Sequence, residues 1–257
     1  IYLSTVTGGS LLMVNVLLKL SYDGRNYHGW QVQKNAVSVQ EVFQGALFKA
    51  LGHKTDIKAC SRTDTGVHAR EFCVSFSTNS GIPPDKIVYA VNTFLPADIA
   101  AFEGIEVDDS FHARYSCKGK QYCYEIWNNR IRNPFYDGYA LHYWRKIDES
   151  LLSRVAAHYV GRHDFTSFCT QDSREMNDMH RTVTQAEVTR EGDKVIFTVA
   201  ADGFLYNMVR IMTGTLLRVQ EGKIKEDEID CIIEARDRKY AGLTAPACGL
   251  FLNKVYY

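Results

Sequence analysis

The sequence predicts an α+β fold built from two units whose β-sheets join. The first observation is that apolar residues alternate with polar ones along several short segments, as they do in strands with one buried face. The second is that other segments carry apolar residues at helical spacing, most clearly from Val39 to Leu51. The third is their order: strand, helix, strand, helix, strand occurs about twice, with hairpins in the second half.

The first half of the chain opens with a predicted strand that starts at Val14 and ends before the turn sequence Tyr22-Asp23-Gly24. Ser38-Val39-Gln40-Glu41 has the pattern of a capping box, which satisfies backbone N–H groups at a helix start. The helix behind it is expected to end at Gly52, because glycine readily adopts the left-handed conformation found after helices. The next expected elements are strands at 57–60 and 72–77, a helix at 85–94 and a strand at 99–107.

The second half is predicted to contain more strands, two of them separated by the turn Arg190-Glu191-Gly192-Asp193. The expected strands are 120–127, 139–144, 182–189, 195–201 and 250–256, and the expected helices are 148–159, 206–219 and 226–235. The predicted domains are an N-terminal α+β subdomain at 13–107 and a C-terminal one at 108–257. Residues 1–12 are expected to form a disordered N-terminal extension.

Composition excludes several classes of protein. The chain has 46% hydrophobic and 23% charged residues, which is typical of a globular protein rather than a disordered or fibrous one. Its seven cysteines contain no C-x-x-C pair, which favours buried thiols in a reducing cytoplasm. Its eight histidines show no metal-ligand spacing, and no nucleotide-binding glycine motif is present, so neither a metal nor a nucleotide cofactor is expected. The only apolar run near the start is interrupted by polar residues, so no membrane association is expected.

The loop from Ser61 to His68 carries the most suggestive chemistry. It places the carboxylate of Asp64 close in sequence to Arg62 and His68, between two predicted strands. A carboxylate kept ionised by nearby donors or a cation can act as a base or a nucleophile. Asp-Thr-Gly is also ordinary turn chemistry, however, because an aspartate side chain can bond its own backbone. The local pattern therefore leaves both interpretations open.

Basic and aromatic residues are interleaved between residues 111 and 146. This stretch contains seven Lys and Arg residues but only two acidic residues. After Phe111 it also contains nine tyrosine, tryptophan and phenylalanine residues. Cations neutralise phosphates and aromatic rings stack on unpaired bases, so this composition is typical of an RNA-binding surface. The same aromatic residues can instead belong to the core, since Tyr122, Tyr124 and Ile126 share one face of a predicted strand.

Arg210 lies at the edge of an apolar stripe on the predicted helix 206–219. Such an arginine either extends its guanidinium to water or pairs with a buried acid. The helix pattern names no partner for it.

Eight segments, in the same order, resemble the tRNA pseudouridine synthase A (TruA) family. They are Tyr22-Asp23-Gly24 with Tyr27-His28-Gly29-Trp30-Gln31, Ser38-Val39-Gln40-Glu41, Arg62-Thr63-Asp64-Thr65-Gly66-Val67-His68-Ala69, Phe111-His112-Ala113-Arg114, Lys120-Gln121-Tyr122-Cys123-Tyr124, Asp164-Phe165-Thr166-Ser167-Phe168, Phe204 with Met208-Val209-Arg210, and Ala245-Pro246-Ala247-Cys248-Gly249-Leu250. The resemblance extends from about Val14 to Tyr257. One departure is Ser61, which stands where the family usually has glycine.

The resemblance implies two ferredoxin-like (RRM-like) α/β units joined into one largely antiparallel mixed sheet, flanked by helices, with a central active-site cleft. It also implies a cytoplasmic homodimer without a cofactor, which isomerises uridine to pseudouridine at positions 38 to 40 of the tRNA anticodon stem-loop. Asp64 matches the catalytic aspartate and Arg210 the arginine that pairs with it. The other implied substrate contacts are Arg62, Tyr122 and Leu250. The residues expected to bind RNA are His68, His112, Arg114, Lys118, Lys120, Arg130 and Arg132.

The implied reaction needs one carboxylate, which can attack the sugar, attack the base or remove a sugar proton; the sequence does not choose among these routes. Two other functions stay open from the residues. A catalytically silent tRNA-binding protein or RNA chaperone would use the same basic and aromatic surface. A glycoside or nucleoside hydrolase normally needs a second placed carboxylate, and no second acid recurs in a comparable loop.

Overall fold

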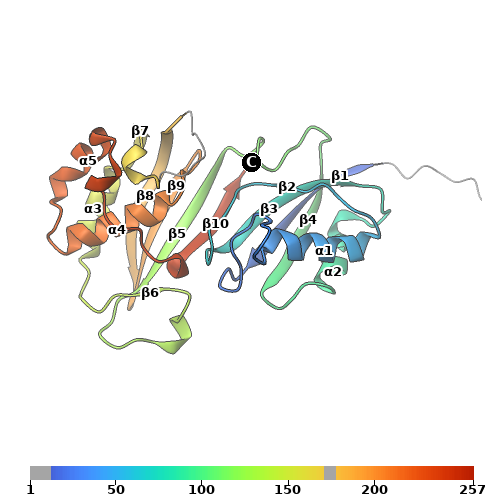
Figure 1. The fold of residues 1–257 in the computed structure, drawn as a ribbon, viewed down its shortest axis with the longest axis horizontal. Helices are drawn as coiled ribbons and strands as arrows, with labels where there is room; N and C mark the ends of the chain where they lie inside the picture. The colour runs from blue at the N-terminus through green and yellow to red at the C-terminus, as the bar shows by residue number, and fades with distance from the viewer. Residues whose placement is uncertain (1–12, 171–177) are drawn as a thin grey trace, which may run out of the picture.

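The fold is described by a computed structural model covering residues 13–170 and 178–257. Within these residues, ten strands form one mixed sheet in the order β4-β1-β3-β10-β5-β9-β8-β7, with β2 beside β3 and β6 beside β5 (Figure 1). The pairs β3–β10 and β5–β6 are parallel, and the other pairs are antiparallel. The predicted α+β class with a largely antiparallel sheet is confirmed. The expected extension at residues 1–12 lies outside the described residues.

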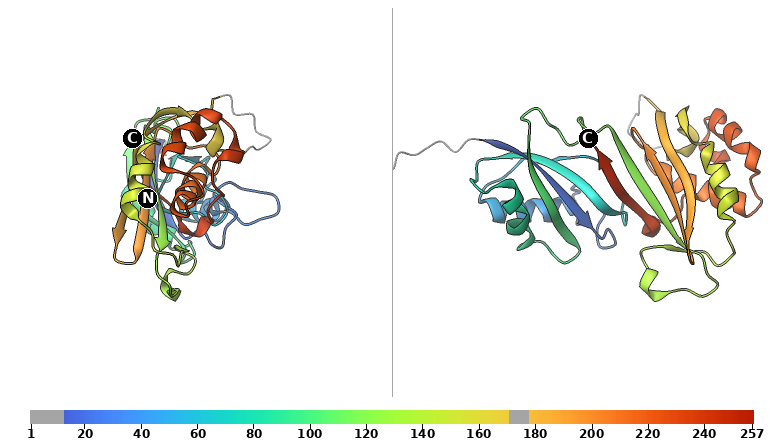
Figure 2. Two further views of the ribbon diagram at one scale, coloured as in Figure 1. Left: turned by 90° about the vertical axis from the view of Figure 1, so that its left-hand side faces the viewer. Right: turned by 180° about the vertical axis from the view of Figure 1, so that it is seen from behind.

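The strands and helices alternate along the chain much as the apolar pattern predicts. The strands are β1 (Val14–Tyr22), β2 (Lys58–Ala59), β3 (His68–Thr78), β4 (Ile99–Val107), β5 (Gly119–Trp127), β6 (Leu141–His142), β7 (Gly161–Asp164), β8 (His180–Glu191), β9 (Lys194–Ala201) and β10 (Leu250–Tyr256). The helices are α1 (Val39–Leu51), α2 (Pro84–Asn92), α3 (Glu149–Ala157), α4 (Met208–Gln220) and α5 (Ile229–Ala235). Helices α1 and α2 pack beside the first strands, and α3, α4 and α5 beside the later ones (Figures 1 and 2).

Helix α1 begins and ends where its sequence predicts. The Ser38 hydroxyl accepts a hydrogen bond from the Glu41 N–H at 3.3 Å, which satisfies one of the helix's first backbone donors. Gly52 ends the helix with a φ of 78°, and its N–H donates to the carbonyl of Phe48. Phe43 and Leu47, which lie one turn apart, are fully buried. The cap and the apolar spacing therefore determine this helix locally.

Strand β10 joins the two halves of the sheet, because the end of the chain inserts between β3 and β5 (Figure 1). Phe251 lies opposite His68 on one side, and Leu252 lies opposite Tyr122 on the other. This position brings residues from the start, middle and end of the chain onto neighbouring strands. The domain boundary near residue 107 remains a prediction.

Three predicted elements differ from the structure, and one strand has no counterpart in the prediction. The strand expected from Phe72 begins at His68. The strand expected at 139–144 is only Leu141–His142, because the Asn128 side chain bonds the carbonyls of Tyr143 and Arg145 in place of a longer strand pairing. The segment expected as one helix at 226–235 is a 3₁₀ turn followed by α5. Strand β7 escapes prediction, because its four residues, Gly-Arg-His-Asp, show no alternation of apolar residues.

Aromatic residues fill the core on the helix side of the sheet. In the first half, Trp30 stacks on Phe72 with ring centroids 4.1 Å apart. In the second half, Tyr159 contacts Phe168 edge to face at 5.3 Å. These rings are fully buried or nearly so. Among the helices of the described residues, none combines the length and apolar character that crossing a bilayer requires.

Candidate active site

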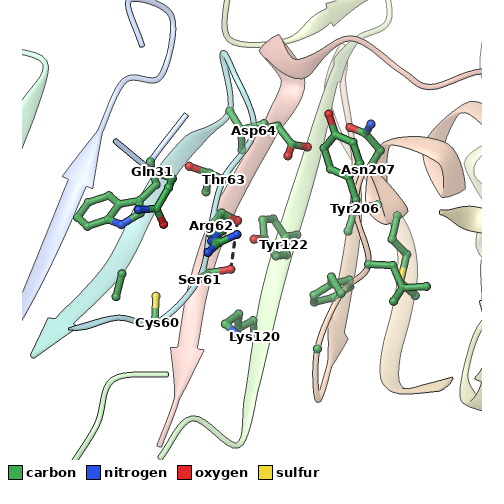
Figure 3. Close-up of a pocket in the computed structure, with 18 of the residues that line it drawn as sticks. Gln31, Cys60, Ser61, Arg62, Thr63, Asp64, Lys120, Tyr122, Tyr206 and Asn207 are labelled. Carbon is green, nitrogen blue, oxygen red and sulfur yellow. Dashed lines mark hydrogen bonds between the residues drawn. The ribbon is translucent and has the colours of Figure 1, made fainter. Parts of the chain in front are cut away.

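A central cleft of about 1320 Å³ lies where the two halves of the sheet meet. The loop that carries Ser61 to Asp64 lies on one side of the cleft, Tyr122 of β5 lies in its floor, and Tyr206 and Asn207, before α4, lie on the other side (Figure 3). Leu250 of β10 also lines the cleft. The structure therefore brings Arg62, Asp64, Tyr122 and Leu250 to one cleft. Arg210 reaches it from the first turn of α4 through its contact with Asp64.

The loop that carries Asp64 is held by the segment that follows β1. The Trp30 N–H donates to the carbonyl of Thr63 at 3.2 Å, and the Gly66 N–H donates to the carbonyl of Tyr27 at 3.2 Å. The hydroxyls of Tyr22 and Thr63 share a hydrogen bond of 2.8 Å. Backbone and side chain thus fix the loop on both sides of Asp64.

Two glycines allow this close approach. A Cβ atom on Gly24 would lie 2.1 Å from the carbonyl oxygen of Val67, and one on Gly29 would lie 2.3 Å from that of Thr63. Gly29 also has a φ of 79°, which favours glycine. The spacing of these glycines after β1 is therefore explained by the loop that packs on them.

Asp64 and Arg210 meet across the cleft. Nη1 of Arg210 lies 3.7 Å from Oδ2 of Asp64, and both side chains are partly shielded from water. Nε of Arg210 donates to the carbonyl of Ala245 at 2.7 Å, and Nη1 donates to Oδ1 of Asn207 at 2.8 Å. Arg210 is thus paired with an acid inside the cleft, which decides between the two possibilities left open by its position on the helix.

Tyr122 and Leu250 form an apolar floor beside these charges. Tyr122 is 6% exposed, and its ring contacts Phe204 edge to face with centroids 5.0 Å apart. Burial raises the pKa of the Tyr122 phenol, so the hydroxyl remains protonated at neutral pH. Leu250 lies on the neighbouring strand opposite Tyr124, where it is also buried.

The residues expected to bind RNA fall into three groups. His112, Arg114 and Lys120 line the central cleft. Lys118 lies beside a smaller hollow of about 420 Å³ next to β5. Arg130 and Arg132 are exposed in the loop after β5, outside the residues that line the central cleft.

The structure contradicts the prediction that His68 contacts RNA. Its side chain is 1% exposed and its ring stacks on Phe251 at 4.7 Å, so it is closed to RNA in this structure. The Gly24 N–H donates to Nδ1 at 3.1 Å, and Nε2 lies 3.0 Å from the carbonyl oxygen of Gly138. His68 therefore connects the loop of Asp64 to the segment before β6, which is a structural role.

Several further residues line the central cleft without having been expected there from the sequence. They include His28, Gln31, Arg181, Tyr206 and Asn207. The one local signal is at Asn207, a residue type that favours helix starts, directly before an apolar helix. Across residues 13–170 and 178–257, no group of three or more His, Cys, Asp or Glu side chains is placed to hold a metal ion.

Comparison with known proteins connects this geometry to a family. The family model described as tRNA pseudouridine synthase matches residues 20–116 and 155–257. The chain is 49% identical to the tRNA pseudouridine synthase A of Acetivibrio thermocellus over 245 residues, covering 95% of this chain and 100% of that one. It is 45% identical to the protein of the same name from Clostridium acetobutylicum, over 95% of this chain and 100% of that one.

A solved structure titled "Crystal Structure of a Cbf5-Nop10-Gar1 Complex" aligns with 93% of this chain and 58% of that chain, at 13% identity and a TM-score of 0.35. Similarity at this level adds nothing to the assignment. The family-model match covers most of the chain, and the named relatives match it over nearly its whole length at more than 40% identity. These matches show that the chain belongs to the tRNA pseudouridine synthase family, whose enzymes are isomerases.

Proposed function

We propose that this isomerase converts uridine to pseudouridine at positions 38 to 40 of the tRNA anticodon stem-loop, with Asp64 as the catalytic carboxylate. The observation that carries the proposal is the contact of 3.7 Å between Asp64 and Arg210 in the central cleft. A guanidinium stabilises a nearby carboxylate in its ionised form, which is the form that can act as a nucleophile or a base.

The reaction explains why a single carboxylate suffices. The bond between C1′ of the ribose and N1 of uracil breaks, the uracil turns, C5 bonds to C1′, and the proton on C5 leaves while N1 ends protonated. Atoms and electrons balance without water, an oxidant or a second substrate. Asp64 attacks the sugar or the base, or removes a sugar proton, and all three routes start from its ionised form.

Tyr122 and Leu250 hold the uracil while it turns. Both are buried in the floor of the central cleft, so they offer an apolar surface on which a flat base can pack. Because burial raises the pKa of its phenol, Tyr122 keeps its proton and serves as a packing and hydrogen-bonding group.

Basic residues around the central cleft supply the energy for base flipping. Extruding a base from a stem costs on the order of a few kcal/mol. Arg62, Arg114 and Lys120 line the cleft and can contact the phosphates that flank the target. These contacts also place the reacting nucleotide against Asp64.

The test replaces Asp64 by Asn or Ala and follows hydrogen label released from C5 of uridine in anticodon stem-loop RNA. The expected result is a loss of turnover of about 10³-fold or more, with tRNA affinity changed only a few-fold. Asp109→Asn, an exposed carboxylate outside the cleft, is the matched control and should retain full activity. Retained isomerisation in the Asp64 variants would refute the assignment. RNAs with cytidine at position 38, 39 or 40 identify the modified positions.

The same assay separates two other functions. A catalytically silent tRNA-binding protein or RNA chaperone would bind tRNA without releasing label from C5. A nucleoside hydrolase would release free uracil. Either result with the unmodified protein would overturn the proposed reaction.

We extend the proposal to the assembly. A cytoplasmic homodimer that binds one tRNA across both subunits follows from the family resemblance. The molar mass of the protein in solution, measured with and without tRNA, checks the two-copy state.

A further inference from the structure

Asn207 has an unusual backbone for a residue with a side chain. Its φ of 62° and ψ of 8° lie in the left-handed region, where it stands at the N-cap of α4. Among the described residues other than glycine, only Arg236 shares a positive φ. Asparagine tolerates this region better than most residues, which explains how the chain adopts it here.

The side chain of Asn207 does not cap the helix that it begins. Asparagine is among the preferred N-cap residues because its side-chain oxygen can accept a backbone N–H. No such bond forms from Asn207. Its amide instead contacts two groups at the edge of the central cleft, Arg210 and Thr170 (Figure 3 shows Asn207 near Asp64).

The chemistry of the partners fixes the orientation of the amide. A guanidinium only donates hydrogen bonds, so Oδ1 of Asn207 must face Nη1 of Arg210, at 2.8 Å. Nδ2 then donates to the hydroxyl of Thr170 at 3.1 Å. The N–H of Thr170 donates to the carbonyl of Tyr206 at 3.1 Å. These two bonds connect Thr170 to the turn that begins α4.

Nη1 of Arg210 lies between the side chains of Asn207 and Asp64. Nη1 donates to Oδ1 of Asn207 and lies 3.7 Å from Oδ2 of Asp64. Nε is held separately by the carbonyl of Ala245 at 2.7 Å. The bond from Asn207 thus holds Nη1, the guanidinium nitrogen that contacts the Asp64 carboxylate.

We propose that Asn207 is a positioning residue, which aligns Arg210 with Asp64 and is itself oriented by Thr170. This inference rests on the proposed function, because it acts through the Asp64–Arg210 pair. It predicts a defect in turnover rather than in tRNA binding.

The first experiment uses Asn207→Gly, which keeps the backbone conformation accessible and removes the amide. The expected result is a fall in kcat of roughly 10- to 100-fold, with KM for tRNA changed less than about 3-fold. Arg236→Gly is the control, because Arg236, at the end of α5, is the other described non-glycine residue with a positive φ. It should leave kcat unchanged. Thermal unfolding of each variant checks that the fold is retained.

The second experiment tests the orientation by Thr170. Thr170→Val removes the acceptor of the Asn207 amide and should lower kcat, whereas Thr170→Ser keeps the hydroxyl and should restore it. Equal kcat in the two variants would contradict the role of Thr170 in the proposal.

A double-mutant cycle separates this inference from the proposed function. Single-turnover rates are compared for Arg210→Ala, Asn207→Gly and the double variant. If Asn207 acts through Arg210, Asn207→Gly adds no further loss when Arg210 is absent. Additive losses, or full activity of Asn207→Gly beside an impaired Arg210→Ala, would overturn the positioning role alone. Full activity of Arg210→Ala would overturn the pairing on which the proposed function depends.

Discussion

The buried imidazole of His68 shows how one residue of the segment Arg62 to Ala69, which resembles the family, can serve the fold. It lies four positions after Asp64, yet its ring stacks on Phe251 and faces away from solvent. Asp23 lies beside it, with Oδ1 3.2 Å from Nδ1. Closeness in sequence to Asp64 therefore does not place a side chain in the same cleft, because Asp64 lies in the loop whereas His68 begins β3 and is packed within the sheet.

The titration of His68 predicts a pH dependence of stability. Burial lowers the pKa of the imidazole, although the Asp23 carboxylate and the Gly138 carbonyl act to raise it. Burial also acts to raise the pKa of Asp23, but hydrogen bonds from Arg25 and Tyr139 outweigh it and hold this pKa at about 2. Asp23 thus stays ionised across the range in which His68 titrates.

Whether stability rises or falls with pH depends on whether the folded or the unfolded protein protonates His68 at the higher pH. The unfolded chain protonates His68 near its usual pKa of about 6.5, and the folded protein only at lower pH. His68 therefore contributes full stability above about pH 6.5, and this contribution falls as the pH drops toward the lowered folded pKa. Between pH 7.5 and pH 5.5, the thermal unfolding temperature should fall more in the unmodified protein than in His68→Gln. Equal losses would contradict this.

At the scale of elements, β10 is the strand that the cleft depends on. It carries Leu250 into the floor and pairs with β3 and β5, which connect to the Asp64 loop and to Tyr122. A strand inserted between two others buries both its edges, so its side chains pack against neighbours from both halves.

Leu252 is the position at which this packing is most sensitive. It is 0% exposed and lies between Ala69 of β3 and Tyr122 of β5. We expect Leu252→Ala to lower the free energy of unfolding by about 2–5 kcal/mol, because it leaves a cavity in the core. Urea unfolding measures the change. Lys254→Ala, an exposed position on the same strand, should change it by less than about 0.5 kcal/mol. A similar effect of both substitutions would show that β10 is not packed as described.

At the scale of the whole molecule, charge is balanced in total but not in space. The chain has 30 basic and 30 acidic residues. The described lining of the central cleft nevertheless contains the cations Lys58, Arg62, Arg114, Lys120 and Arg181, with Asp64 the acidic residue among them. Local clustering of this kind attracts a polyanion even when the net charge is zero.

The salt dependence of tRNA binding tests whether the RNA also passes over Lys118, Arg130 and Arg132. Replacing all three by serine should weaken binding and flatten the slope of log affinity against log salt, by roughly 0.7–0.9 for each phosphate that the variant no longer neutralises. A control with Lys86, Lys223 and Lys239, exposed cations elsewhere on the surface, should keep the slope. An unchanged slope in the first variant would place the RNA path elsewhere.

The kinds of elements and most of their order can be predicted from the amino-acid sequence. Periodicity, caps and turns are local properties, which is why α1 and the hairpin of β8 and β9 are predictable. The family resemblance also identifies Asp64 and Arg210 without any knowledge of the contact between them. Local patterns miss β7, and they overextend β6 where the Asn128 side chain replaces strand pairing.

Which side chains meet is a property of the folded molecule. The pairing of Asp64 with Arg210, the burial of His68 and the bonds of Asn207 all join segments that are distant along the chain or turn away from its regular elements. Such contacts depend on how strands are ordered in the sheet, and above all on β10 entering between β3 and β5. No local periodicity carries that information, because the order is set by packing of the complete core.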